Sequence, residues 1–154
     1  MKKHLVVLIA LLLIPGVLSS QQLGLGAVVG SPTGLALKYM LGRSSAFAAH
    51  AGWSIIGDKG IHITGDYQYL FHMVIRTAEG ATVSSLAPYV AAGGRFRFKE
   101  RNGDNEFHLG MRIGGGMEYM LARVGIFLEI VPVINLIPET DFDLEGGLGF
   151  LFYF

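Results

Sequence analysis

The chain has 154 residues, of which 22 are glycine and none is cysteine; 51% are hydrophobic, 16% are charged, and the formal net charge is +0. This length allows one domain, and the lack of cysteine excludes a disulfide framework, a thiolate metal site and a cysteine nucleophile. The balanced charge supplies no basic field for nucleic acid, so we expect no nucleic-acid partner. Because an interior glycine costs a helix about 1 kcal/mol, the glycine content argues against a helical protein.

Residues 1–20 have the three-part layout of a secretory signal peptide. A basic head with Lys2 and Lys3 precedes the apolar run Leu5–Ile14, which Pro15 interrupts. A transmembrane helix needs ~20 apolar residues, and this run is too short for one. The sequence therefore predicts an exported mature chain, residues 21–154. Removal of the two lysines leaves 10 basic residues against 12 acidic ones, a net charge of −2.

The mature chain alternates between two kinds of residue with a period of two, which is typical of β-strands with two different faces. Eight such segments lie near residues 22–30, 34–41, 45–56, 60–73, 86–99, 106–121, 124–134 and 141–154. Turn-forming residues separate them. Because most of these connections are short, we expect neighbouring strands to pair as antiparallel hairpins.

The two faces of the segments differ in the same way along the chain. In the last segment, Phe150, Phe152 and Phe154 alternate with Gly147 and Gly149. A membrane barrel turns its large apolar side chains toward lipid and keeps small and polar ones inside. Charge in a dry soluble core would be costly, whereas a closed barrel leaves no unpaired edge in lipid. The sequence therefore predicts an all-β fold, an eight-stranded antiparallel up-and-down transmembrane β-barrel. The alternative, a soluble lipocalin-like carrier, needs the faces inverted.

Two local features are predicted from the same pattern. Aromatic residues near strand ends, at Tyr39, Trp53, Tyr119 and Tyr153, fit the girdles at the two bilayer interfaces. The run Gly114–Gly116 predicts a bend or bulge.

The C-terminal run from Gly147 to Phe154 resembles the terminal signal of bacterial outer-membrane barrels, in which a glycine precedes two alternating aromatics and the chain ends on phenylalanine. Gly149, Phe152 and Phe154 match this signal, while Gly147 stands where the family usually has a polar residue. Together with the signal peptide and the alternation, this resembles the small eight-stranded barrels of the OmpA and OmpX type.

The resemblance implies a location and an assembly route, but no activity, because such barrels serve as anchors, adhesins, enzymes and stress proteins. It implies the outer membrane of a Gram-negative bacterium, contact with outer-membrane lipid and lipopolysaccharide, and recognition by the barrel-assembly machinery. It also implies that both chain ends lie in the periplasm. We expect a monomer.

An eight-stranded barrel is only just wide enough for its own side chains, and nine charged residues fall on the predicted inner face. They are Lys38, Asp66, Arg95, Arg97, Arg112, Glu118, Glu129, Asp143 and Glu145. We expect them to pair and plug the lumen. The hairpin register places Glu129 roughly opposite Glu145, at a depth similar to that of Arg112. Our hypothesis is that Arg112 bridges these two carboxylates; the alternative is that each charge faces lumen water separately.

No catalytic, cofactor-binding or metal-binding site is predicted. Lipid A deacylases use a histidine and a serine two residues apart, but the residue two after His108 is Gly110, which has no hydroxyl. Ser54 is four residues from His50. His62 and His72 are about 33 Å apart along one strand and cannot share a metal. The sequence favours a structural or envelope-integrity role over a narrow channel or small-ligand conduit, and either over a lipid A-modifying enzyme.

Overall fold

The computed structural model describes residues 22–53, 60–73, 75–76, 82–83, 85–101 and 104–154; the predicted signal peptide, residues 1–20, lies outside them. Ten strands occur in this part of the chain. They are β1 (Leu23–Ser31), β2 (Gly34–Met40), β3 (Ser45–Trp53), β4 (Gly60–Leu70), β5 (Ile75–Arg76), β6 (Thr82–Val83), β7 (Leu86–Arg101), β8 (Asp104–Leu121), β9 (Val124–Ile137) and β10 (Asp141–Tyr153). Among the described residues, no helix has the length and apolar character needed to cross a membrane.

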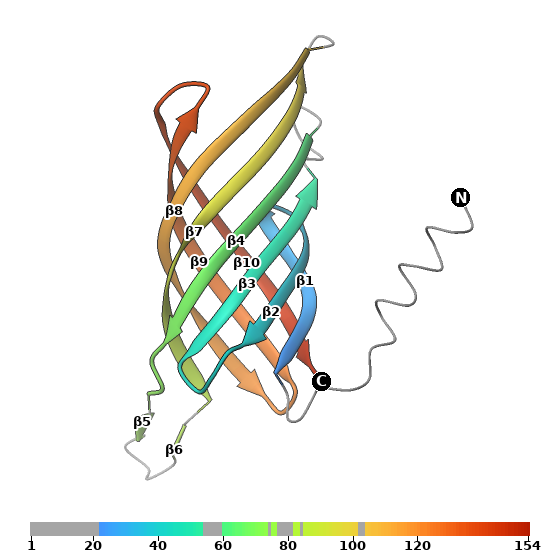
Figure 1. Cartoon of the computed structure of the whole chain (residues 1–154). Coiled ribbons are helices and arrows are strands. Elements are labelled where there is room, and N and C mark those ends of the chain that lie inside the picture. Colours follow the sequence, from blue (N-terminus) through green and yellow to red (C-terminus); the bar gives the residue numbers. More distant parts are fainter. Residues whose placement is uncertain (1–21, 54–59, 74, 77–81, 84, 102–103) are drawn as a thin grey trace, which may run out of the picture.

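Eight of these strands close into a barrel in the order β1-β10-β9-β8-β7-β4-β3-β2, and β5 and β6 pair separately (Figure 1). All barrel neighbours are antiparallel, and the closing seam pairs β1 with β10, where the Phe154 amide donates to the Leu23 carbonyl at 3.0 Å. The predicted eight-stranded antiparallel barrel is therefore confirmed. Three strands are longer than predicted: β7 continues to Arg101, β8 begins already at Asp104, and β9 continues to Ile137.

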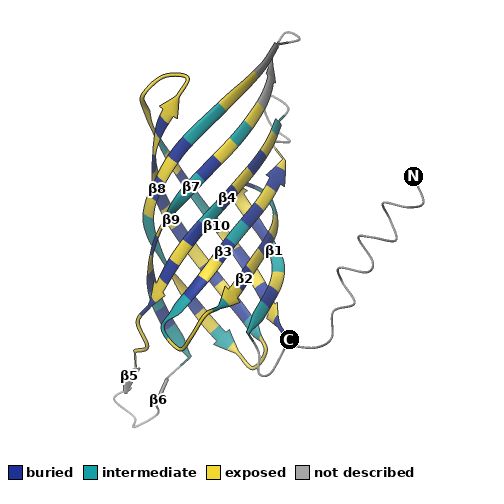
Figure 2. Cartoon of the chain, viewed as in Figure 1, coloured by how far each residue is buried: buried dark blue, intermediate teal, exposed yellow. Residues whose placement is uncertain are grey.

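Buried and exposed residues alternate along the strands (Figure 2). The exposed positions carry the large apolar side chains, and the buried positions carry the charged ones. On β10, Phe142 is 65% exposed and Phe150 53%, whereas Glu145 is 2% exposed. Arg95 and Arg112 are each 1% exposed and are the two largest of the fully buried side chains. This distribution is the reverse of that in a soluble protein, in which charged residues are almost never fully buried unless paired.

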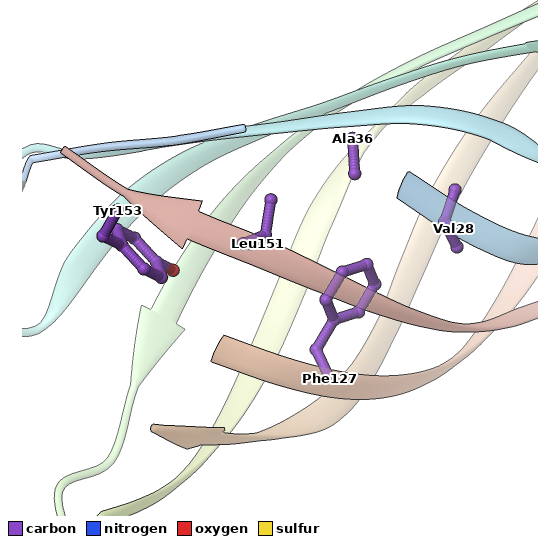
Figure 3. Packing of buried hydrophobic residues seen from close by; sticks show 5 residues of the cluster. All are labelled: Val28, Ala36, Phe127, Leu151 and Tyr153. Carbon is purple, nitrogen blue, oxygen red and sulfur yellow. The ribbon is translucent and has the colours of Figure 1, made fainter. Parts of the chain in front are cut away.

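Apolar side chains fill the lumen near the end of the barrel that carries Phe154, here called the C-terminal end; the opposite end is called the distal end. One group, shown in Figure 3, contains Val28, Ala36, Phe127, Leu151 and Tyr153. A second group contains Ala46, Leu70, Ala87, Tyr89 and Ala91.

Two local predictions need correction. Tyr153 does not belong to an aromatic girdle: it is 3% exposed and lies inside the barrel, because its neighbours Phe152 and Phe154 point outward and successive strand residues alternate. The register irregularity in β8 lies at Leu109/Gly110, whereas Gly115 and Gly116 continue the regular pairing with β9. Tyr39, Trp53 and Tyr119 are exposed, as predicted.

The β9–β10 register also differs from the prediction. Glu145 pairs with Val131 and Glu129 pairs with Gly147, so the two glutamates are diagonal neighbours rather than opposite each other. The turn of the β9–β10 hairpin is centred one residue later in the chain than predicted. Each β9 residue therefore pairs with a β10 residue two positions later than expected. Since a shift of two keeps each side chain on its face, both carboxylates still point into the lumen.

Candidate functional site: the charged lumen

All nine charged residues predicted for the inner face lie on it, seven of them buried and Arg97 and Asp143 partly exposed at the distal end. Arg112 of β8 is at the centre of this group. Its Nη1 donates a hydrogen bond to Glu145 Oε2 at 2.6 Å, and its Nη2 lies 3.8 Å from Glu129 Oε1. Arg112 therefore lies within ion-pair distance of both glutamates named in the hypothesis. A third carboxylate, which the hypothesis did not include, lies 3.2 Å away, from Arg112 Nε to Asp66 Oδ1.

Glycine on the intervening strand makes the contact between Arg112 and Asp66 possible. Gly93 of β7 pairs with Arg112 on one side and with Asp66 on the other. A Cβ at Gly93 would lie 2.4 Å from Asp66 Oδ1 and closer still to the Gly65 carbonyl oxygen. Any larger residue there would occupy the space through which the two charged side chains meet.

The same arrangement recurs at Gly116 of β8, which pairs with Tyr89 on β7 and with Glu129 on β9. The Tyr89 hydroxyl donates to Glu129 Oε2 at 3.4 Å across this glycine. A Cβ at Gly116 would lie 2.5 Å from the Tyr89 hydroxyl oxygen. Inward-facing glycines therefore clear the space between interacting side chains on the strands that flank them, which explains part of the high glycine content.

Arg95 organises the distal part of the lumen. Its guanidinium donates to Glu145 Oε1, to Asn135 Oδ1 and, at 2.8 Å, to Asp143 Oδ2. Arg97 Nη2 adds a hydrogen bond to Glu145 Oε1 at 3.2 Å. Glu145 thus accepts from Arg95, Arg97 and Arg112, so three arginines from two strands, β7 and β8, converge on one carboxylate of β10.

A separate polar group lies nearer the C-terminal end, around Glu118 of β8. Lys38 Nζ donates to Glu118 Oε2 at 2.5 Å, and the Tyr153 hydroxyl donates to Glu118 Oε1 at 2.5 Å. Lys38 Nζ also lies 4.9 Å from the centroid of the Tyr89 ring, in a cation–π contact. Glu118 therefore ties β2 and β10, the strands on either side of β1, to the opposite wall of the barrel.

Several partners of the charged residues were not predicted: His50, His62, Tyr89, Asn135 and Tyr153. His62 Nε2 lies 3.2 Å from Glu145 Oε1, and His50 Nδ1 lies 3.5 Å from Glu129 Oε1. Strand parity places all five on the inner face, so alternation carried the signal that could have found them. The predicted charge network contained formal charges alone, so it left out these neutral hydrogen-bonding groups, although the alternation already placed His50 and His62 on the inner face.

A cavity of about 10 Å³ lies beside Lys38, His50, Gln68 and Tyr89. This is close to the space that one water molecule needs.

The residues of the predicted assembly signal lie at the seam and on the outer face. Phe152 and Phe154 are 41% and 52% exposed, and their rings meet edge to face with centroids 5.1 Å apart. Gly149 faces inward beside Phe127, and a Cβ there would lie 2.5 Å from Phe127 Cζ. Gly149 thus has a packing role in the barrel, whatever its part in recognition.

The residues weighed for catalysis or metal binding do not converge. β4 ends at Leu70, so His72 lies beyond the strand and is exposed, away from His62. His108 Nε2 lies 3.5 Å from Glu106 Oε2 near the distal end. Ser54 falls outside the described residues. No group of three metal-ligating side chains was found in the described part of the chain.

Replacing Tyr153 by phenylalanine should lower the free energy of unfolding by about 1–3 kcal/mol, because Glu118 loses a buried charge-assisted hydrogen bond while the ring remains. The matched control is Tyr119→Phe on the outer face of the barrel, where tyrosine is 41% exposed. Urea unfolding in detergent micelles measures both. Equal stability of the two variants would contradict a stabilising role for the Tyr153 hydroxyl.

No protein-family model matches the chain, and no curated protein matches it in sequence. The chain is similar in structure to the N-terminal β-barrel domain of Pseudomonas aeruginosa OprF, solved by crystallography, with a TM-score of 0.65 and 18% sequence identity over 86% of this chain and 95% of that one. The chain therefore has the fold of that eight-stranded barrel domain, which confirms the predicted resemblance in architecture.

Proposed function

We propose that the mature chain is an integral outer-membrane β-barrel protein of a Gram-negative bacterium, exported by the signal peptide 1–20, with a structural or envelope-integrity role. The observation that carries this proposal is the reversed distribution of side chains, apolar outside and charged inside. On β10, outward residues from Phe142 to Phe152 are apolar or glycine. At ~3.3 Å per residue and a tilt of ~40°, this stretch spans about 25 Å, the height of the apolar band of a membrane barrel.

Membrane insertion can be tested by fractionation and gel mobility. We expect the full chain, expressed in a Gram-negative host, to require detergent for extraction from the outer-membrane fraction and to migrate differently in gels before and after heating. Release into the soluble periplasm without detergent would contradict the proposal and favour the lipocalin-like carrier.

The second part of the proposal is that the lumen is plugged. Its support is the pairing of the buried charges: Arg112 and Glu145, both nearly inaccessible, are joined at 2.6 Å in the middle of the barrel. Burial of unpaired ions would cost several kcal/mol each, so the charged residues are held in these contacts. Solutes would have to displace this network to pass.

Purified barrel inserted in a planar bilayer should therefore give no large steady conductance. Gel mobility of the same preparation, measured before and after heating, serves as the control that the protein added is folded. A stable conductance step from a folded sample would favour the narrow channel instead.

The lipid A-modifying alternative is tested by mass analysis of lipid A from cells with and without the protein. We expect the same lipid A mass in both. An altered mass in cells that contain the protein would contradict a purely structural role.

A further inference from the structure

The wall of the barrel is uneven in height at the distal end. β1 ends at Ser31, which pairs with Gly146 of β10. The five β10 residues Asp141–Glu145 pair with β9 on one side. On the other side, no strand of the described chain pairs with them. Figure 1 shows the β9–β10 hairpin rising above the connection between β1 and β2. This stretch is a free strand edge at the rim of the barrel, and free edges are sites at which chains associate. The β8 residues Asp104–His108 form a second such edge, because the pairing of β8 with β9 begins at Leu109.

The amides that point to this edge can be identified from the hydrogen-bonding pattern. The Phe154 amide bonds to β1, so even-numbered residues of β10 direct their N–H groups toward the β1 side, since the direction alternates along an antiparallel strand. Leu144 is opposite Pro132, which has no N–H to offer, in agreement with this assignment. The free edge therefore carries the amides of Phe142 and Leu144.

Both amides are already bonded within the strand. The Phe142 N–H donates to Asp141 Oδ1 at 2.7 Å, and the Leu144 N–H donates to Asp143 Oδ1 at 2.9 Å. Asp143 is itself held in place, because its other carboxylate oxygen accepts from Arg95 Nη1 at 2.8 Å. The lumen network thus orients one of the two residues that occupy the donors of the edge.

We propose that Asp141 and Asp143 are edge-capping residues that prevent a second copy of this chain from pairing with the free edge of β10. Phe142 and Leu144 are 65% and 60% exposed. An unsatisfied N–H at such an apolar surface is costly in lipid. Two copies could otherwise satisfy these donors through a two-fold symmetric antiparallel pairing of β10 with β10. Capping removes the donors that such a pairing needs and keeps the barrel monomeric.

Oligomeric state separates capping from simple charge repulsion. Asp141→Ala removes the acceptor and the charge, Asp141→Asn keeps an acceptor oxygen without the charge, and Glu139→Ala removes a nearby exposed charge from the β9–β10 connection. In detergent micelles, light scattering should give monomers for the wild type, Asp141→Asn and Glu139→Ala. The double variant Asp141→Ala, Asp143→Ala should associate as concentration rises.

Cross-linking locates the contact. The chain contains no cysteine, so Leu144→Cys introduces a single thiol at the edge. Oxidation should yield a disulfide-linked dimer in the double alanine background and several-fold less in the wild-type background. Equal cross-linking in both backgrounds, or association of Asp141→Asn and Glu139→Ala to the extent seen with alanine, would overturn the proposal.

Amide hydrogen exchange tests the cap directly and needs only the single variant Asp141→Ala. The double variant also removes the contact between Asp143 and Arg95 in the lumen, so its effects are less specific. In the folded, detergent-solubilised barrel, Phe142 should exchange about tenfold faster in Asp141→Ala than in the wild type, because one hydrogen bond is lost. Exchange in Asp141→Asn should stay near the wild-type rate. An unchanged Phe142 rate in Asp141→Ala would refute the cap. If the protein were found in the soluble fraction of cells, the proposed outer-membrane location would be wrong. The exchange rate of the Phe142 amide in the folded barrel would still test the capping proposal.

Discussion

Replacing Arg112 by methionine should lower the free energy of unfolding by about 3–5 kcal/mol, because it leaves buried carboxylates without their cation. Arg112 lies within ion-pair distance of Glu145, Glu129 and Asp66, and it is 1% exposed. Unfolding in urea can be followed in micelles by the fluorescence of Trp53, the one tryptophan of the chain. This is the largest stability effect that we expect from a single substitution in the lumen.

Two further variants separate charge from packing at this position. Arg123→Met, in the exposed turn between β8 and β9, removes the same charge from the surface and should change stability by no more than about 0.5 kcal/mol. Adding Glu145→Gln to Arg112→Met should restore part of the loss, because it removes one of the uncompensated negative charges. Equal destabilisation by Arg112→Met and Arg123→Met would show that the central ion pairs contribute nothing.

Replacing Phe152 and Phe154 by alanine should reduce the amount of assembled barrel in the outer membrane several-fold. This prediction rests on the resemblance of the C-terminal run to the assembly signal. It also rests on the exposed, edge-to-face pair that the two rings form beside the β1–β10 seam. The folded fraction in the outer membrane is measured from gel mobility without heating.

The matched control is the pair Phe96→Ala and Phe98→Ala on β7. These residues also alternate, face outward and are 44% and 47% exposed, but they lie toward the distal end, away from the chain terminus. Both double variants remove two outward phenylalanine rings of similar exposure, so they should refold to similar extents in detergent. If the β7 pair reduced assembly in cells as strongly as the C-terminal pair, loss of lipid contact rather than loss of recognition would explain the result.

The outer face shows how much of the fold could be predicted from sequence. Along β10, the alternation of Phe150 and Phe152 with Gly149 and Leu151 indicated a strand, and Phe150 and Phe152 face outward as predicted. The girdle assignment of Tyr153 is wrong because the phenol ring suits both a membrane interface and a hydrogen-bonded interior site. Parity with its exposed neighbours would have placed it inside.

The lumen shows where sequence reasoning ended. Its nine charged residues were predicted to face inward, yet the three carboxylates around Arg112 come from β4, β9 and β10. Their meeting depends on a hairpin centre that was misplaced by one residue and on Gly93, whose missing side chain lets Asp66 reach Arg112. The role of this network as a plug stays a prediction.

The sequence by itself determined the eight strands of the barrel and the two faces of each, because a period of two is a local property that each segment carries alone. Only the tertiary structure decided which groups meet. Lys38 and Glu118 are 80 residues apart in the chain, and 2.5 Å separates their side chains in the lumen. Such contacts depend on the register of every strand between the partners and on the stagger at which the barrel closes, and no single segment encodes these.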